Sequence, residues 1–187
     1  MLDLGTEAPA FALPDVLSGV TLSLDDAAGP KGLLVMFICR HCPYVRHVQV
    51  ELAKIGNDYK PKGLGIVAIC SNDAIEHPAD APDSLREMAQ ELGFVFPFLY
   101  DESQAVAKAY KAACTPDFFL FDAHRSLVYR GQLDDSRPGK PAPVDGHDLR
   151  AAMDAVLSGG TVSPEQRASL GCNIKWKAGN APAYFGR

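Results

Sequence analysis

The chain has 187 residues, of which 47% are hydrophobic and 22% are charged, and its formal net charge is -5. This length suits one domain that buries its own core without the support of disulfide bonds. The acidic balance argues against a sequence-independent grip on nucleic acid, which needs a basic surface.

The first residues carry no sign of an export or membrane segment. Residues 1–7 lack both a basic region and an apolar stretch, so they do not resemble a secretory signal. The longest apolar run, residues 33–39, is far shorter than the about 20 residues that span a bilayer. We therefore expect a cytoplasmic protein without nucleic-acid or membrane partners.

In the first half of the chain, short extended pieces over residues 5–15 and 20–24 precede a continuous apolar run at 33–38. Such a run predicts a strand buried on both faces. Pro43 favours the start of a helix, because proline is common at the first helical position. Apolar residues then recur at helical spacing as far as Ile55, and residues 64–70 form another apolar strand.

The second half predicts further helices and strands in alternation, before a tail from residue 161 that is rich in Gly, Pro and Asn. The expected elements are a helix at 83–92, an extended segment at 94–99, a helix at 103–113, a hairpin of 117–121 with 127–130, and a helix at 147–157.

This order indicates an α/β fold, with a central mixed β-sheet flanked by helices, an N-terminal β-hairpin extension and an irregular C-terminal tail. We expect one domain over residues 1–160, with residues 161–187 packed against it as the tail.

The chain has five cysteines: Cys39, Cys42, Cys70, Cys114 and Cys172. An odd number without an export signal argues against a static disulfide framework. A close pair in a reducing compartment is more often catalytic or metal-binding than structural.

The segment Cys39-Arg40-His41-Cys42 stands where a buried strand is expected to pass into a helix. Backbone N–H groups at a helix start stabilise a thiolate, and Arg40 and His41 add positive charge nearby. The second cysteine of the pair can close a disulfide after the first has reacted. Zinc binding needs a second compact set of Cys or His ligands, which the scattered remaining residues do not supply. We expect redox chemistry without a metal or an organic cofactor, because sulfur itself carries the electrons.

Three segments together resemble the thioredoxin-fold superfamily, in particular redoxin proteins of the alkyl hydroperoxide reductase–thiol-specific antioxidant branch. They are Ala8-Pro9-Ala10-Phe11-Ala12-Leu13-Pro14, the strand from Leu33 that leads to Cys39-Arg40-His41-Cys42-Pro43, and Cys114-Thr115-Pro116-Asp117-Phe118. The resemblance covers most of residues 5–158. It implies a thioredoxin fold with Cys39 and Cys42 as the catalytic thiols, supported by His41 and by Thr115 before a cis Pro116.

The resemblance leaves open which thiol attacks. Counted from Phe37 as in thioredoxin, the attacking cysteine is Cys42, with Cys39 as a displaced resolving partner. Read instead like the Cys-Pro-His-Cys of periplasmic disulfide oxidants, the nucleophile is Cys39. We favour Cys42, because Pro43 indicates that Cys42 caps the helix.

Three other residues are candidates for supporting roles. Arg137 lies in a segment that loosely resembles the place of the peroxide-binding arginine in peroxiredoxins, although an ordinary loop arginine is the simpler interpretation. Cys114 and Cys172 are possible additional redox thiols, and a buried anchor is the simpler interpretation of Cys172.

The function we predict is thiol–disulfide exchange through Cys39 and Cys42 by an antioxidant oxidoreductase. One alternative is a peroxiredoxin-like thiol peroxidase that reduces hydroperoxides through Cys42. A third is a copper-handling chaperone on the same fold. In the two redox cases the partners are a protein or small-molecule disulfide or a hydroperoxide, together with an external thiol reductant such as a thioredoxin system.

Overall fold

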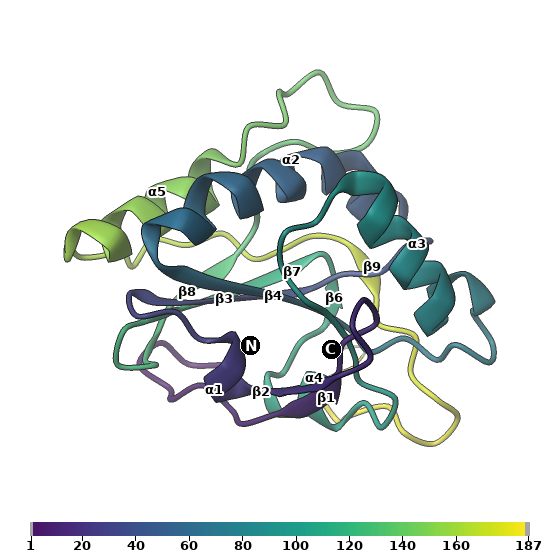
Figure 1. Cartoon of the computed structure of the whole chain (residues 1–187). Helices are drawn as coiled ribbons and strands as arrows, with labels where there is room; N and C mark the ends of the chain where they lie inside the picture. Colours follow the sequence, from purple (N-terminus) through teal and green to yellow (C-terminus); the bar gives the residue numbers. More distant parts are fainter. Residues whose placement is uncertain (1, 186–187) are drawn as a thin grey trace.

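The most deeply buried strand of the computed structural model, β3, runs through the middle of a central β-sheet (Figure 1). The structure describes residues 2–185. Its strands are β1 (Ala12–Pro14), β2 (Thr21–Ser23), β3 (Gly32–Phe37), β4 (Leu64–Cys70), β5 (Phe98–Tyr100), β6 (Cys114–Thr115), β7 (Asp117–Asp122), β8 (Leu127–Gly131) and β9 (Cys172–Asn173). Its helices are α1 (Leu24–Ala27), α2 (Pro43–Tyr59), α3 (Pro82–Leu92), α4 (Ala105–Ala109) and α5 (His147–Ser158), with 3-10 turns η1 (Lys60–Lys62) and η2 (Pro78–Asp80).

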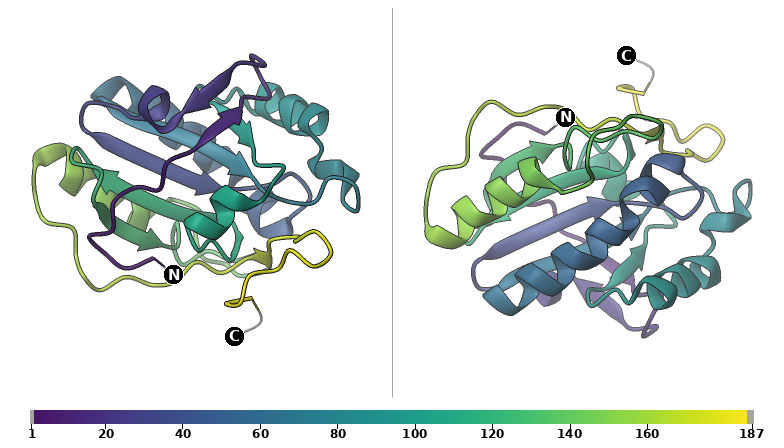
Figure 2. Two further views of the ribbon diagram at one scale, coloured as in Figure 1. Left: turned by 90° about the horizontal axis from the view of Figure 1, so that it is seen from below. Right: turned by 90° about the horizontal axis from the view of Figure 1, so that it is seen from above.

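The central sheet contains both parallel and antiparallel pairs. β7 pairs antiparallel with β3 and β8, whereas β4 pairs with β5 in parallel. β3 and β4 lie side by side (Figure 2), and the backbone N–H of Ile38 donates to the carbonyl of Ile69 at 3.0 Å. The strand order is therefore β5-β4-β3-β7-β8, which confirms the predicted mixed sheet.

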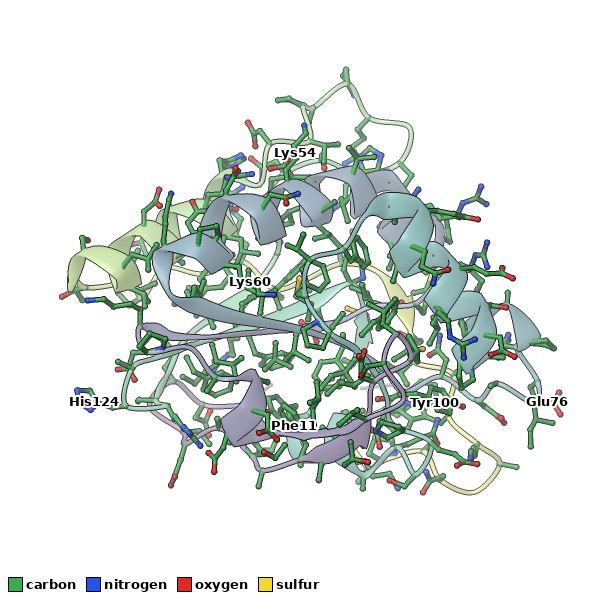
Figure 3. The ribbon with its side chains drawn as sticks, in the orientation of Figure 1. Phe11, Lys54, Lys60, Glu76, Tyr100 and His124 are labelled. Carbon is green, nitrogen blue, oxygen red and sulfur yellow. The ribbon has the colours of Figure 1, made fainter. Side chains whose placement is uncertain are left out.

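The helices α2, α3 and α5 cover one face of this sheet, and the N-terminal hairpin covers the other together with the short helices α1 and α4 (Figures 1 and 2). Successive side chains of a strand point to opposite faces. Leu34 and Met36 accordingly join the core beneath α2 and α5, while Leu33 and Val35 join the core that holds the β1–β2 hairpin and α4. In Figure 3, Phe11 lies in that second layer. Two cores, one on each face, explain why the whole of β3 is apolar.

Two expected elements are shorter in the structure. The helix expected at 103–113 is only α4, because Gln104 and Lys111 take left-handed backbone conformations, with φ of 62° and 49°, at its two ends. The buried Gln104 amide fixes the first of these by donating to the carbonyls of Ser71 at 2.7 Å and Lys175 at 2.9 Å. Of the extended segment 94–99, only the end pairs as β5.

As far as residue 185, the tail after α5 is mostly irregular, and its strand β9 pairs antiparallel with β6. Ile174, directly after β9, is 2% exposed and lies in the core beneath the sheet. Two backbone N–H groups bind buried polar side chains, that of Lys175 to Asn72 at 2.8 Å and that of Lys177 to Gln104 at 2.9 Å. Residues 172–177 are thus held along their length. Among residues 2–185, none of the helices combines the length and apolar character that crossing a bilayer requires.

Candidate active site

Both thiols of the pair lie at the junction of β3 and α2. Cys39 follows the strand and Cys42 is the N-cap of the helix, in an extended conformation with Pro43 at the first helical position. Both cysteines are 0% exposed. The predicted helix start is confirmed, and it places the Cys42 sulfur at the positive end of a 17-residue helix.

The pKa values of the two thiols are displaced in opposite directions. Hydrogen bonding from the Cys39 thiol lowers the pKa of Cys42 well below its ordinary value, and donors from Cys172 and the Val45 backbone act in the same direction against the effect of burial. The same hydrogen bond raises the pKa of Cys39, as do burial and the negative charge of Asp80. One proton shared in this way leaves Cys42 as the thiolate and Cys39 as the thiol.

Asp80 holds the loop between the two cysteines, although nothing in the sequence marked it. Its buried carboxylate accepts the backbone N–H of Arg40 at 2.8 Å, the N–H of His41 at 3.1 Å and the amide of Asn72 at 2.7 Å. The Nδ1 atom of His41 also contacts Asp80, and lies 3.9 Å from the Cys39 sulfur. His77 stacks on the His41 ring at 5.2 Å between centroids.

Arg40 does not support the thiolate, contrary to the expectation from its place in the loop. Its guanidinium turns to α3, where it pairs with Glu87 at 2.6 Å and Glu91 at 3.5 Å and donates to the Ser84 carbonyl at 2.9 Å. Two acidic partners compensate its charge, so the positive end of α2 and the thiol donors remain as the stabilising groups near Cys42.

The segment Cys114–Pro116 lies directly against the pair. The Thr115–Pro116 peptide bond is cis, as predicted. The Thr115 hydroxyl lies 3.3 Å from the Cys39 sulfur, and the Thr115 carbonyl oxygen lies 3.2 Å from the Cys42 sulfur, where it accepts from Cys42 when that thiol is protonated. One residue of this segment therefore contacts both sulfurs.

The three other thiols differ in their surroundings. Cys172 stands opposite Thr115 in the β6–β9 pair and is half-buried. Burial, and then hydrogen bonding to Cys42, raise the pKa of Cys172 to about 11. Cys114 is buried, and its thiol donates to the Pro116 carbonyl at 3.6 Å. Burial raises the pKa of both Cys114 and Cys70, so neither is activated as a thiolate.

Arg137 is placed beside the cis-proline segment rather than at the sulfurs. It lines a small cavity of about 20 Å³ together with Tyr44 and Pro116. Its guanidinium donates to the carbonyls of Asp134 at 2.8 Å and Ser136 at 2.6 Å. Among the described residues, no hydrogen bond or ion pair joins Arg137 to a cysteine.

One group at the site has the ligand atoms for a metal ion. The ligand atoms of Cys39, His41 and Asp80 lie within 4.8 Å of one another. This set offers one sulfur, one imidazole and one carboxylate, and Cys42 is outside it. Cu(I) prefers several soft thiolate ligands, so the set does not favour the copper interpretation.

Comparison with known proteins agrees with this fold. The Redoxin family model matches residues 3–147. An uncharacterized conserved protein from Geobacillus kaustophilus is 54% identical, with a TM-score of 0.93 over 95% of this chain and 94% of that one. A putative thiol:disulfide interchange protein DsbE from Chlorobium tepidum shares the fold at 22% identity, with a TM-score of 0.66 over 84% of this chain and 99% of its own. The thiol-disulfide oxidoreductase ResA of Halalkalibacterium halodurans is 26% identical over 125 residues, which is 66% of this chain and 65% of the length of that relative.

Proposed function

This chain belongs to the Redoxin family and has a thioredoxin fold, and we propose that it is a thiol–disulfide oxidoreductase in which Cys42 attacks and Cys39 resolves. The observation that carries the proposal is the environment of Cys42. Cys42 is the N-cap residue of α2, and hydrogen bonding from Cys39, Cys172 and the Val45 backbone lowers its pKa against the effect of burial. A thiolate with donors arranged around it is the reactive form of cysteine.

The first step forms a mixed disulfide. The Cys42 thiolate attacks one sulfur of the substrate, so that a new S–S bond forms as the substrate disulfide breaks. The displaced sulfur leaves as a thiolate and takes a proton. Loss of the negative charge from Cys42 ends the hydrogen bond that holds the proton on Cys39, which prepares Cys39 for the second step.

In the second step Cys39 gives up its proton and attacks the sulfur of Cys42. The second half of the substrate leaves as a thiol, and the protein retains a Cys39–Cys42 disulfide. The Cys39 proton passes to the departing thiolate of the substrate. His41 has a positioning role: its Nδ1 atom donates to the Asp80 carboxylate and lies 3.9 Å from the Cys39 sulfur. We assign Thr115 to position the same sulfur at 3.3 Å. An external thiol reductant then restores the pair, for which a cytoplasmic thioredoxin system is our proposal.

Cys172 is our candidate for an additional redox thiol. The neighbouring Cys42 contributes to the raised pKa of Cys172, and Cys172 is less buried than Cys39. A Cys42–Cys172 disulfide would replace the Cys39–Cys42 disulfide when Cys39 is blocked. Cys114 has the weaker case, because its thiol is buried and bound to the Pro116 carbonyl.

Peroxide reduction by Cys42 is the second candidate function. It is favoured by the thiolate, which a hydroperoxide oxidises to a sulfenic acid with release of water or alcohol, and Cys39 then condenses with that acid. The position three residues before Cys42 is Cys39, where peroxiredoxins carry a hydroxyl residue. Arg137 is engaged by carbonyls of its own loop. For these reasons we rank peroxide reduction behind disulfide exchange.

The proposal is tested by mixing the fully reduced protein with 2,2′-dithiodipyridine or with hydrogen peroxide in a stopped-flow instrument. We expect rapid release of thiopyridone, followed by a Cys39–Cys42 disulfide in the peptide map, and slow oxidation by peroxide. Disulfide reactivity no greater than that of the Cys42→Ser variant would contradict the proposal. Peroxide oxidation faster than disulfide exchange would favour the second candidate.

A further inference from the structure

The strand edge beside Cys42 is already occupied by the chain itself. An extended peptide can bind a protein by adding a strand to an exposed backbone edge. At the edge that Thr115 presents beside the active thiols, β9 already pairs in antiparallel register, with Cys172 opposite Thr115 and Asn173 opposite Cys114. Cys172 also lies near enough to Cys42 to lower the pKa of that thiol. The tail thus takes the backbone place of a peptide and carries a cysteine beside the active thiol.

The close approach of the tail depends on Gly171. A Cβ atom added at Gly171 would stand 2.0 Å from the carbonyl oxygen of Thr115 and 2.6 Å from its carbonyl carbon. Since both are backbone atoms, a side chain at this position forces the tail and β6 apart. Gly160, in the same tail, meets nothing closer than 3.5 Å. Of these two glycines, therefore, only Gly171 must lack a side chain for β9 to pair with β6.

The tail is anchored on the far side of β9 as well. Ile174 is buried in the core, and its N–H donates to the Ala113 carbonyl at 3.2 Å. Asn72 binds the N–H of Lys175 and also donates to Asp80, which holds the loop between the active thiols. These buried contacts therefore fix β9 in its place beside the active thiols.

We propose that β9 sets the substrate class: it excludes polypeptide disulfides from the edge of β6 and restricts the enzyme to small-molecule disulfides. This inference rests on the proposed disulfide exchange at Cys42. A small disulfide needs no backbone pairing with Thr115.

The test uses two mixed disulfides with the same chromogenic leaving group, 5-thio-2-nitrobenzoate. One is formed with N-acetylcysteine amide and the other with the central cysteine of a short extended peptide. For the wild-type protein we expect the peptide to react about tenfold or more slowly than the small compound, because pairing at Thr115 is blocked. We expect Gly171→Ala to raise the peptide rate about tenfold and to leave the small-compound rate within about twofold. Gly160→Ala is the matched control and changes neither rate.

Hydrogen exchange at the backbone of Asn173 shows whether Gly171→Ala has released β9. Equal wild-type rates for the two compounds would overturn the inference, as would an unchanged peptide rate in a variant whose β9 is released. A length series of such peptides on the wild-type protein gives the same test without a variant, since exclusion predicts a rate that falls as the peptide grows. If neither compound reacts faster than with Cys42→Ser, the proposed function itself is wrong.

Discussion

Two regions of the molecule meet at the Cys42 sulfur and differ in how they are held there. The junction of β3 and α2 is local: Cys42 reaches its place because a strand ends and a helix begins within a few residues. The strand β9 comes from the far end of the chain and depends on the close approach of Gly171 to Thr115. The first region supplies the reactive thiol, and the second decides what can reach that thiol. Chemistry and access are therefore encoded in separate parts of the sequence.

The largest expected effect is the difference in activity between removing the thiol of Cys42 and removing that of Cys172. Cys42→Ser removes the attacking sulfur, and we expect disulfide reduction to fall about 10³-fold or more. Cys172→Ser keeps the helix start and the Cys39 donor, so we expect a change of about threefold or less with small disulfides. Steady-state reduction of 2,2′-dithiodipyridine measures both. A greater loss in Cys172→Ser than in Cys42→Ser would reverse the assignment of the two regions.

The next effect concerns the support of the junction. Asp80→Ala leaves the N–H groups of Arg40 and His41 and the Asn72 amide without their buried acceptor. We expect a loss of about 3 to 5 kcal/mol in the free energy of unfolding, measured by urea denaturation. Asp83→Ala is the control, because Asp83 is exposed and pairs only at the surface with Arg86. We expect a change of about 0.5 kcal/mol or less for it. Similar losses in both variants would show that the loop does not depend on Asp80.

A smaller effect follows from Asp117, which lies between the two regions directly after Pro116. Burial raises the pKa of Asp117 to about 6, and among residues 2–185 its Oδ1 atom has no hydrogen-bond partner. A carboxyl whose folded pKa exceeds its unfolded value stabilises the protein in acid and loses that contribution as the pH rises through the folded pKa. Asp117→Asn removes the cost of the buried charge. We therefore expect the free energy of unfolding of this variant, relative to that of the wild type, to rise by about 2 kcal/mol between pH 4 and pH 7. A difference between variant and wild type that does not change with pH would contradict the raised pKa.

The local region could be predicted from the sequence, and the distant one could not. Pro43 and the apolar spacing as far as Ile55 predict the helix and therefore the place of Cys42. The resemblance of the Thr115-Pro116 segment to the thioredoxin-fold superfamily predicted the cis peptide bond. Asp80 carries no such signal, because only the folded chain brings η2 beneath the loop that it binds. The pairing of β9 is also long-range, and a strand of two residues has no periodicity to detect. For the same reason, the left-handed Gln104 that shortens α4 is set by its distant partners Ser71 and Lys175.

The most direct test of the account is the order in which the cysteines of the reduced protein are alkylated as the pH is varied. Limited treatment with iodoacetamide, followed by mass spectrometry of the peptides, reports the rate at each thiol. We predict that Cys42 reacts first, that its rate follows an apparent pKa well below the ordinary 9.0 of a thiol, and that Cys39 stays unmodified while Cys42 is free. Faster alkylation of Cys39 or Cys172, or a Cys42 rate that rises only near pH 9, would contradict the assignment of Cys42 as the attacking thiolate.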